Sequence, residues 1–411
     1  MFRELISIEK AKQIILENIP SKPVKTEKIP IYEAHRRVLA EDVVAPFDVP
    51  SFNRSIVDGY AVRAEDTFGA EEEKPIKLRL VGKVNVGEAP RIMVNSMEAV
   101  EIATGAAVPE GANAIVMVEY TSKEENNVLI YRPVVKGENI MKAGDDIKRG
   151  EKILKEGEVL GPRKIGVLAA LGRTEVKVYS QPKIAIISTG PEIVDPGKPL
   201  APGKVYDINS YTLSAAVREL GAIPINMGIV PDEEKEIEKA IKTALENADA
   251  VITSGGVSVG QKDLIPKVLA KLGKPGILFC GISIKPGKPT TFAVIDGKPI
   301  FSLPGQPTSS LFVFFMLVRP ALQRMAGTHG ESLPTIEAYA GEKMFPARGR
   351  KTFIMVNLKR DDSGRLIAYP VPKGLSGAIT TLARAAGYIE IPENRQFIEC
   401  GEKVTVYLFG D

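Results

Sequence analysis

The stretch Lys183-Ile-Ala-Ile-Ile-Ser-Thr-Gly-Pro-Glu192 decides the fold. Its apolar, β-branched run ends at a Gly-Pro turn, which is typical of a strand buried on both faces of a parallel sheet. A second run of this kind, Ala250–Ser254, leads directly into the Gly-rich turn Gly255–Gly260. Around both runs, strand and amphipathic helix patterns alternate as β-α-β-α-β-α-β. This order predicts a doubly wound α/β domain.

The other elements of this domain follow from periodicity and turn residues. We expect a helix after Asn209, with Asn209 or Ser210 as its cap, and a final helix over 308–325 that Pro320 bends. Asp296-Gly297 predicts a hairpin turn between two strands. The further predicted helices are 232–248 and 263–272, and the strands are 223–230, 276–283, 290–295 and 299–303.

The regions on either side of the α/β domain have different sequence patterns. Helices are predicted over 8–19, 31–42 and 163–171, and short strand patterns fill residues 77–134 and again 352–408. The sequence therefore predicts a multidomain α/β plus β protein. Its predicted domains are a discontinuous N-terminal domain (1–45 and 146–178), an inserted β-rich domain (46–145), the central α/β domain (179–327) and a C-terminal β-barrel (328–411).

Composition excludes several classes of protein. The 411 residues include 54 Lys plus Arg and 51 Asp plus Glu, so the basic excess of a dedicated nucleic-acid binder is missing. Two Cys and two His cannot form a disulfide framework or an ordinary zinc site, and we expect Cys280 and Cys400 to be buried. Charges interrupt residues 1–12, and the longest apolar run, 311–318, is far short of the ~20 residues of a membrane span. We expect a cytoplasmic protein with no nucleic-acid or membrane partner.

The Gly-rich turn after Ala250–Ser254 is a candidate anion site. It lies after a strand and before a helix, where backbone N–H groups converge on a ligand at the carboxyl end of the strand. Ser254 and Ser258 could add hydroxyl donors, and Gly255 and Gly256 let a phosphate approach closely. A tight connection without a ligand is the alternative. The spacing and the Lys of a Walker loop are missing, which disfavours an ordinary nucleoside triphosphatase.

Charged residues also follow several strands of the predicted domain. Glu192, Asp232 and Asp263 come after three strands, so they could form a rim for Mg²⁺ and substrate, although acids at helix starts are also ordinary caps. Lys285 and Lys288, on a loop stiffened by Pro and Gly, suit an oxyanion site or a solvated basic turn equally.

Four further segments read as turns or connectors. Pro304 and Pro307 either shape a pocket wall or only connect a strand to a helix. From the residues alone, Asp58-Gly59 predicts a hairpin turn, and the segments around Thr104 and Asp146 also read as turns.

Seven motifs in order resemble one family, the molybdopterin molybdenumtransferases, called MoeA in bacteria and matched by the E domains of plant and animal molybdenum-insertion proteins. The resemblance covers nearly the whole chain. The motifs are Ser55–Ala61, Thr104–Pro109, Gly144–Ile147, Ser188–Glu192, Ser254–Gly260, Lys285–Pro289 and Leu303–Pro307.

The resemblance implies a fold and an activity. Members of the family are homodimers whose active site takes residues from both subunits, with a central molybdopterin-binding domain. They insert molybdenum from molybdate into adenylylated molybdopterin and release AMP, assisted by Mg²⁺. The adenylyltransferase that makes the substrate and acceptor molybdoenzymes are the protein partners to expect.

The family's functional residues can be carried over by position. The acids fall on Asp58, Asp146, Glu192, Asp232 and Asp263, beside Thr104. Glu192 and Asp263 are the candidates for Mg²⁺ and for cleavage of the phosphoanhydride. Ser254, Gly255, Gly256 and Ser258 are assigned to the phosphate or pterin side of the ligand, and Pro304 and Pro307 to its pocket wall. Molybdate is assigned to Lys285, Lys288, Arg350 and Ser376.

The sequence departs from the family pattern at three places. Ile56-Val57 replace Ala-Met, Glu101-Ile102-Ala103 replace Arg-Ile-Met, and Gln306 replaces Asn. These changes alter the pocket's charges and leave tungstate as an alternative to molybdate. Two other functions stay open: molybdopterin adenylylation, and a non-catalytic scaffold that binds the cofactor.

Overall fold

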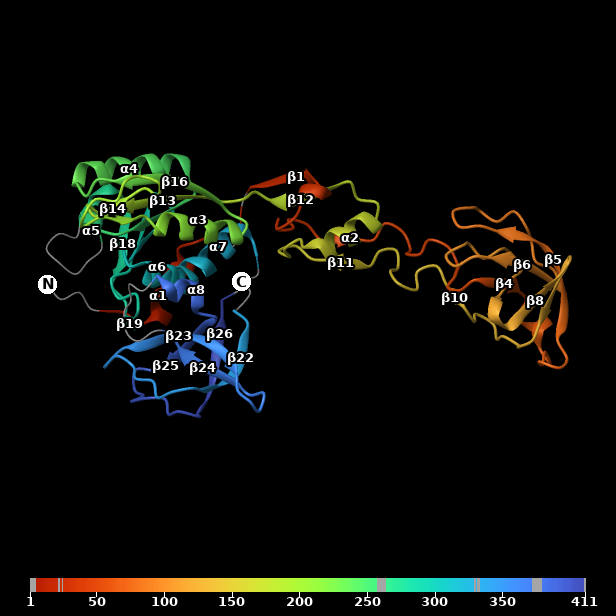
Figure 1. The fold of residues 1–411 in the computed structure, drawn as a ribbon. Coiled ribbons are helices and arrows are strands. Elements are labelled where there is room, and N and C mark those ends of the chain that lie inside the picture. Colours follow the sequence, from red (N-terminus) through yellow and green to blue (C-terminus); the bar gives the residue numbers. More distant parts are fainter. Residues whose placement is uncertain are drawn as a thin grey trace. The chain divides into compact units, whose positions relative to one another are not determined.

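The computed structural model describes residues 5–20, 23, 25–256, 264–328, 330, 333–371 and 379–409. The chain forms two compact units (Figure 1). The first unit contains Met1–Ala40, Gly157–Gly161 and Glu175–Asp411, and the second contains Glu41–Glu156 and Pro162–Thr174. The boundaries of the four predicted domains stay a prediction.

A six-stranded sheet forms the centre of the first unit. Its first four strands run parallel, and the last two are antiparallel to their neighbours. The strand order is β16 (Ile223–Val230), β13 (Lys183–Thr189), β17 (Ala250–Ser254), β21 (Lys298–Leu303), β20 (Thr291–Ile295) and β18 (Pro275–Cys280).

Helices cover both faces of this sheet, as the predicted doubly wound fold requires (Figure 1). One face packs against α3 (Asn209–Glu219) and α6 (Pro307–Val313), through residues such as Leu213 and Phe312. The other packs against α4 (Glu234–Asn247) and α5 (Leu264–Leu272). Successive residues of β13 are buried on opposite faces, which is why its sequence is continuously apolar.

Two local predictions in this unit have different outcomes. The hairpin turn is confirmed, because Asp296 and Gly297 both have positive φ, 48° and 79°. The predicted cap of α3 is wrong, because the Asp207 carboxylate accepts the Ser210 N–H at 3.1 Å and takes that role. The side chain of Asn209 is thereby free for another use.

The final helix of the α/β domain contains a wide turn. After α6, residues Phe314–Val318 (η4) form a π-helix, and α7 (Arg319–Ala326) follows with Pro320 in its first turn. The helix prediction over 308–325 is confirmed, but no sequence pattern indicated the π-helical segment. Such segments concentrate near functional sites.

The C-terminal strands close into a barrel, as predicted. Each strand pairs with the next, and β25 pairs back to β23. The strand order is β23 (Lys351–Arg360), β24 (Leu366–Pro370), β22 (Thr335–Ala340), β26 (Lys403–Leu408) and β25 (Gly387–Ile391).

The barrel shares a hydrophobic core with the α/β sheet. Phe312 of α6 lies 4.8 Å from Phe353 of β23 and 5.4 Å from Tyr388 of β25, measured between ring centroids. All three rings belong to the cluster that also contains Ile184 and Ile186 of β13. Burial raises the pKa of Tyr388 far above its usual value, so this phenol stays neutral.

The predicted helix over 31–42 is wrong. α1 (Ile8–Glu17) is followed by β1 (Thr26–Pro30), which pairs with the later strand β12 (Glu175–Tyr179). Within residues 31–42 only Ile31–Glu33 (η1) is helical, as a short 3₁₀ turn. The Leu39 N–H donates to the Glu158 carbonyl at 2.9 Å, and the Ala40 N–H donates to the Lys177 carbonyl at 3.0 Å. Pairing with distant backbone therefore overrides the local helical pattern.

The second unit has a six-stranded sheet of its own, which confirms the predicted β-rich region. Only β5 and β6 are parallel among its paired strands. The strand order is β7 (Ala114–Met117), β4 (Gly59–Val62), β6 (Glu98–Ile102), β5 (Ile76–Val84), β9 (Asn127–Ile130) and β8 (Thr121–Glu124). The predicted helix α2 (Pro162–Ala170) is also present.

Two remaining expectations concern cysteines and membranes. Cys280 is half-buried, but Cys400 is exposed, so the expectation of a buried thiol is wrong there. None of the helices in the described part of the chain is long and apolar enough to cross a membrane.

The hairpin predicted at Asp58-Gly59 is also wrong. Gly59 is the first residue of β4 and lies opposite both Ile102 and Met117. A Cβ on Gly59 would lie 1.9 Å from the Val116 carbonyl oxygen. Glycine is required here because a neighbouring strand approaches closely, and not because the chain turns.

We predict that Gly59→Ala destabilises the second unit by about 1–3 kcal/mol, because the added methyl must push β7 away. Gly82→Ala is the matched control. In that variant the new Cβ meets only the flexible end of the Ile92 side chain. Urea unfolding followed by circular dichroism measures both variants, and equal midpoints would contradict this account.

Candidate functional site

The carboxyl ends of three parallel strands meet at one edge of the α/β sheet. Ser188 of β13 lies beside Ser254 of β17, and Ser254 lies beside Leu303 of β21. At this edge of a doubly wound sheet, loops leave the strands and ligands bind. Ser254 and Pro304, both predicted site residues, are buried there.

The turn after β17 depends on its glycines. Gly255 has φ +95°, and a Cβ on it would lie 2.0 Å from the Thr189 carbonyl oxygen. Gly256 also has a positive φ, +64°. The backbone of this turn therefore crosses the end of β13 at a distance that only glycine permits. The predicted residues Ser258 and Asp263 lie outside the described residues.

Asn209 links the turn to the neighbouring loop. Its side-chain amide donates to Ser254 Oγ at 2.7 Å and to the Gly305 carbonyl at 2.8 Å. Asn209 Oδ1 is buried and lacks a hydrogen-bond partner within the described residues, and the same holds for Ser188 Oγ. Buried polar atoms of this kind are costly unless a ligand or water satisfies them.

Sequence reasoning missed this role of Asn209. The available signal was a run of polar residues on the apolar face of the helix. Asn209, Ser210 and Ser214 are all buried although each has a polar side chain. Polar residues on the face that packs against a sheet indicate a network or a ligand more than a cap.

Two predicted acids lie at the same edge. Asp232 follows β16, and the Thr189 hydroxyl donates to its Oδ1 over a long 3.4 Å. Glu192 is exposed after β13, and its carboxylate bends back over Gly190, whose Cβ would lie 2.7 Å from Oε2. Among the described residues, no three His, Cys, Asp or Glu side chains gather as a ready-made metal cage.

The predicted cations lie on adjoining segments of the first unit. Lys285 is exposed on β19 (Ile284–Lys285), which pairs with β23 so that Lys285 lies opposite Thr352. Arg350 is half-buried and directly precedes β23. The carbonyl of Lys288 accepts the Ile282 N–H at 3.0 Å, which folds the loop back on itself. Ser376 lies outside the described residues.

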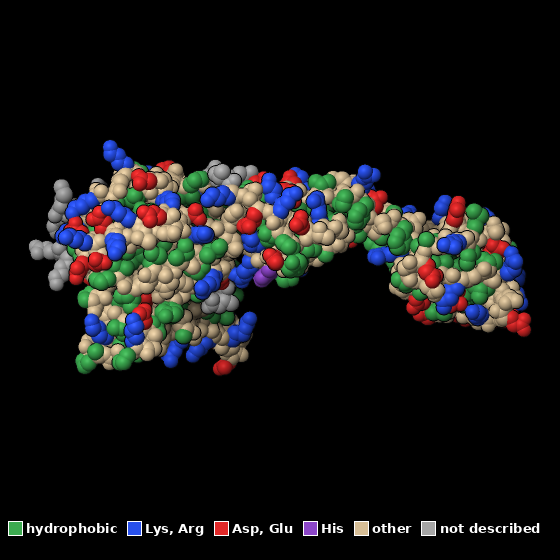
Figure 2. Space-filling model, turned by 90° about the horizontal axis from the view of Figure 1, so that it is seen from above, with side chains coloured by type: hydrophobic (Ala, Val, Ile, Leu, Met, Phe, Trp, Pro, Cys, Tyr) green, Lys and Arg blue, Asp and Glu red, His purple; other side chains and the backbone are tan. Residues whose placement is uncertain are grey.

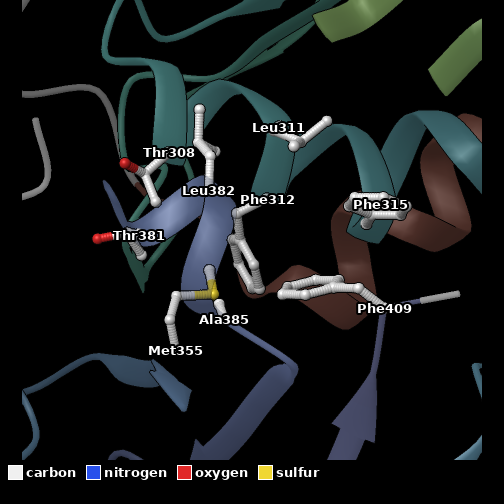
Figure 3. A pocket seen from close by; sticks show the side chains of 9 residues that line it. All are labelled: Thr308, Leu311, Phe312, Phe315, Met355, Thr381, Leu382, Ala385 and Phe409. Carbon is white, nitrogen blue, oxygen red and sulfur yellow. The ribbon is translucent and has the colours of Figure 1, made fainter. Parts of the chain in front are cut away.

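A small apolar cavity opens beside Thr308, next to the predicted Pro307 (Figure 3). Its volume is about 70 Å³. Aromatic rings of Phe312, Phe315 and Phe409 form its wall, and its polar residues are Thr308 and Thr381. Uncharged walls of this kind suit an apolar group and not an oxyanion.

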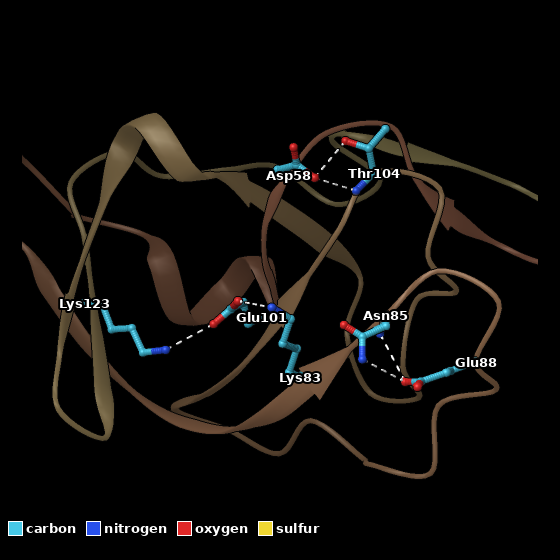
Figure 4. Close-up of polar contacts among 7 residues, drawn as sticks. All are labelled: Asp58, Lys83, Asn85, Glu88, Glu101, Thr104 and Lys123. Carbon is cyan, nitrogen blue, oxygen red and sulfur yellow. Dashed lines mark hydrogen bonds and ion pairs between the residues drawn. The ribbon is translucent and has the colours of Figure 1, made fainter.

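In the second unit, Asp58 and Thr104 form a pair (Figure 4). Asp58 Oδ1 accepts the Thr104 N–H at 2.7 Å and the Thr104 hydroxyl at 3.0 Å. The backbone bond and then the hydroxyl bond from Thr104 hold the pKa of Asp58 below its usual value. This exposed carboxylate is therefore ionised at neutral pH, with one oxygen turned away from Thr104.

Backbone pairing brings these two residues together. The Ser55 N–H donates to the Ala106 carbonyl at 3.0 Å, and the Gly105 N–H donates to the Ser55 carbonyl at 2.8 Å. Asp146, also exposed, is held by its backbone N–H, which donates to the Val49 carbonyl at 3.1 Å. The structure thus unites Asp58 with Thr104, while Asp146 belongs to a separate loop.

The departure at Glu101 does not add an acid to this pair. Its carboxylate lies 2.8 Å from Lys83 Nζ and 3.1 Å from Lys123 Nζ (Figure 4). Hydrogen bonds from Lys83 and then Lys123 lower the pKa of Glu101. On the face drawn in Figure 2, acidic and basic side chains are likewise interspersed. Local ion pairs therefore neutralise the changed charge.

Sequence comparison divides the chain among three known regions. Residues 6–172 match the MoeA N-terminal region (domain I and II), and residues 185–324 match a probable molybdopterin binding domain. Residues 337–409 match the MoeA C-terminal region (domain IV). Together these matches span nearly the whole chain.

Curated relatives and solved structures agree with this. Molybdopterin molybdenumtransferase from Haemophilus influenzae is 35% identical over 408 residues, covering 99% of each chain. The Staphylococcus aureus protein of the same name is 34% identical, over 99% of this chain and 96% of its own. Two structures of Pyrococcus horikoshii molybdopterin biosynthesis MoeA protein match 99% of this chain and 100% of theirs, with TM-scores of 0.84 and 0.85 at 41% and 34% identity.

We predict that Thr104→Val raises the pKa of Asp58 toward its ordinary value, because valine keeps the backbone bond to Oδ1 but removes the hydroxyl bond. A depressed pKa stabilises the fold above the unfolded value, and this stabilisation fades as the pH falls through the folded value. NMR titration of the Asp58 carboxyl carbon measures it. Thr121→Val, in the same unit, should leave that titration unchanged.

We also predict that Gly255→Ala destabilises the first unit by roughly 1–3 kcal/mol, because alanine is strained at positive φ and its methyl meets the Thr189 carbonyl. Gly305→Ala is the control, since its Cβ would lie no closer than 3.5 Å to any atom beyond its chain neighbours. Thermal unfolding compares the two variants. A Gly305→Ala loss as large as that of Gly255→Ala would refute the explanation.

Proposed function

The chain belongs to the MoeA family of molybdopterin molybdenumtransferases, transferases that insert molybdenum into molybdopterin during molybdenum cofactor biosynthesis, and we propose the chemistry by which this member does so. In this proposal the substrates are adenylylated molybdopterin and molybdate, and the products are the molybdenum cofactor and AMP. Molybdate is favoured, with tungstate as the alternative oxoanion.

The edge of the α/β sheet where β13, β17 and β21 end supports this proposal most directly. The Gly255–Gly256 turn lets an anionic group approach the backbone, and the buried Oδ1 of Asn209 and Oγ of Ser188 lack partners within the described residues. A ligand with phosphate oxygens and pterin N–H groups offers both donors and acceptors. We therefore assign this edge, with Ser254 and Ser258, to the phosphate or pterin side of adenylylated molybdopterin.

Molybdate is assigned to the cations that the sequence predicts for it. Lys285, Lys288 and Arg350, together with Ser376, supply ammonium, guanidinium and hydroxyl donors to its oxygens. Charge-assisted bonds to an oxoanion are stronger than neutral ones, and the planar guanidinium of Arg350 can donate twice. These cations also offset the negative charge that accumulates when an oxoanion and a phosphoanhydride come together.

Mg²⁺ is assigned to acids that follow strands of the sheet in the sequence. Magnesium usually keeps several waters and takes one or two carboxylates plus substrate phosphates, so a three-acid cage is not needed. Glu192 and Asp263 would hold it, with Asp232 nearby after β16. When bound, Mg²⁺ would draw charge from the phosphoanhydride whose cleavage releases AMP.

Asp58 is proposed to act as an acceptor. Its lowered pKa leaves it ionised at neutral pH, so it can orient water or take a proton but cannot donate one. Thr104 fixes the position of Asp58 Oδ1. Asp146 is the second acid of this unit that we assign to the site. We propose that the protein is a homodimer in which these acids complete the site of the partner subunit.

The cellular setting follows from the proposed reaction. Its substrate must come from a molybdopterin adenylyltransferase, and its product must pass to acceptor molybdoenzymes, which are the protein partners we propose. We place the reaction in the cytoplasm. The single molybdopterin-binding region at residues 185–324 gives no second copy to make the adenylylated substrate.

We predict that the purified protein forms AMP and metal-loaded cofactor from adenylylated molybdopterin, molybdate and Mg²⁺. Asp58→Asn should lower turnover by about 10²-fold or more, the size typical of a lost charged group in an active site. Asp66→Asn is a matched control. Asp66 is also an acid of the second unit that accepts a backbone N–H, from Met97 at 2.7 Å.

Chromatographic assay of AMP decides the outcome. Absence of AMP with the wild-type protein would overturn the proposed chemistry, and equal activity of the two variants would remove Asp58 from the mechanism. ATP consumption with molybdopterin would indicate the adenylyltransferase instead. Binding of the cofactor without any turnover would indicate a scaffold.

A further inference from the structure

Four charged side chains gather where α1 meets the barrel. Lys351 Nζ lies 2.7 Å from Glu9 Oε1 and 2.6 Å from Glu390 Oε1. Lys12, one turn after Glu9 on α1, is half-buried close to Glu390 and Glu9. The side chain of Lys351 is only 25% exposed, so solvent screens its two ion pairs less than it screens surface pairs.

The same place holds two very short backbone pairings. Ile6, just before α1, pairs with Ile282, and the Ser283 N–H donates to the Ile6 carbonyl at 2.8 Å. On the other side, β19 pairs with β23 through only two residues. Such short ladders are marginal by themselves, so the segment 281–285 needs further support to keep its position.

The register places the predicted cations around Lys351. Ile284 lies opposite Lys351, and Lys285 lies opposite Thr352. Because strand side chains alternate, Lys285 and Thr352 share one face, while Ile284 and Lys351 share the other. Arg350 precedes Lys351, and its carbonyl accepts the Thr352 hydroxyl at 3.1 Å.

We propose that Lys351 is a positioning residue for the molybdate site. Its ion pairs to Glu9 and Glu390 lock the start of β23 against α1 and β25. Because β19 pairs with β23, these ion pairs also fix the distance between Lys285 and Arg350. Those two cations bind the oxoanion on the face of the β19–β23 pair opposite to Lys351. Cations held in place lose less conformational entropy when the anion binds. The inference rests on the proposed assignment of molybdate to these cations.

The test compares Lys351→Met, which removes both ion pairs, with Lys351→Arg, which can keep them. Lys403→Met is the control, because Lys403 and Glu337 form an exposed pair of 2.8 Å on the same barrel. Calorimetry measures the Kd of molybdate with each full-length protein, and hydrogen exchange follows the amides of residues 284–285 and 351–352. Glu390→Gln, which weakens only one pair, replaces Lys351→Met if that variant does not fold.

We expect Lys351→Met to raise the Kd for molybdate by about tenfold, which corresponds to about 1.4 kcal/mol of binding free energy, and to speed hydrogen exchange along β19–β23. Lys351→Arg should restore both values, and Lys403→Met should change neither. Unchanged exchange, or faster exchange with an unchanged Kd, would overturn the proposal. If the wild-type protein binds molybdate without forming AMP, the proposed function is refuted, but the Kd values of the Lys351 variants still test the positioning role. If the wild-type protein does not bind molybdate, the proposed function and the positioning role are both refuted.

Discussion

The close crossing of the β17 turn over the end of β13 is the constraint on which the α/β site depends. Gly255 passes so near the Thr189 carbonyl that no side chain fits between them. This crossing presents the backbone of the turn to a ligand at the sheet edge, and Asn209 then ties it to the loop after β21. Rigid strands below and a hydrogen-bonded bridge above keep the edge in a shape set before the ligand arrives.

Much of this arrangement could be predicted from the sequence. The strands 183–189 and 250–254 have the bounds that the sequence predicts, because buried strands are short apolar runs with clear turn signals at their ends. Residues 31–42 were not, because their backbone bonds go to segments more than a hundred residues away. The hairpin turn predicted at Asp58-Gly59 was wrong for a related reason. The dipeptide pattern cannot show that a neighbouring strand lies too close to residue 59 for a side chain to fit.

The candidate site, too, could be predicted from the sequence only in part. A Gly-rich turn and acids after strands were visible in the sequence, because the topology of a parallel sheet gathers strand ends at one edge. The bond between Asp58 and Thr104 joins residues 46 positions apart and depends on the pairing of two irregular segments. Only the family resemblance indicated that pair. The network around Asn209 needed the structure, since an Asn at a helix start is most simply explained as a cap.

The aromatic contact between the barrel and the α/β sheet has a consequence for evolution. Phe353 and Tyr388 of the barrel fill the same core as Phe312 and the strand residue Ile186. A barrel built this way is not a module that gene fusion or loss could add or delete freely, because its removal would expose the interior of its neighbour. Lineages that keep the sheet must therefore keep the barrel, or else redesign the face of α6 that it covers.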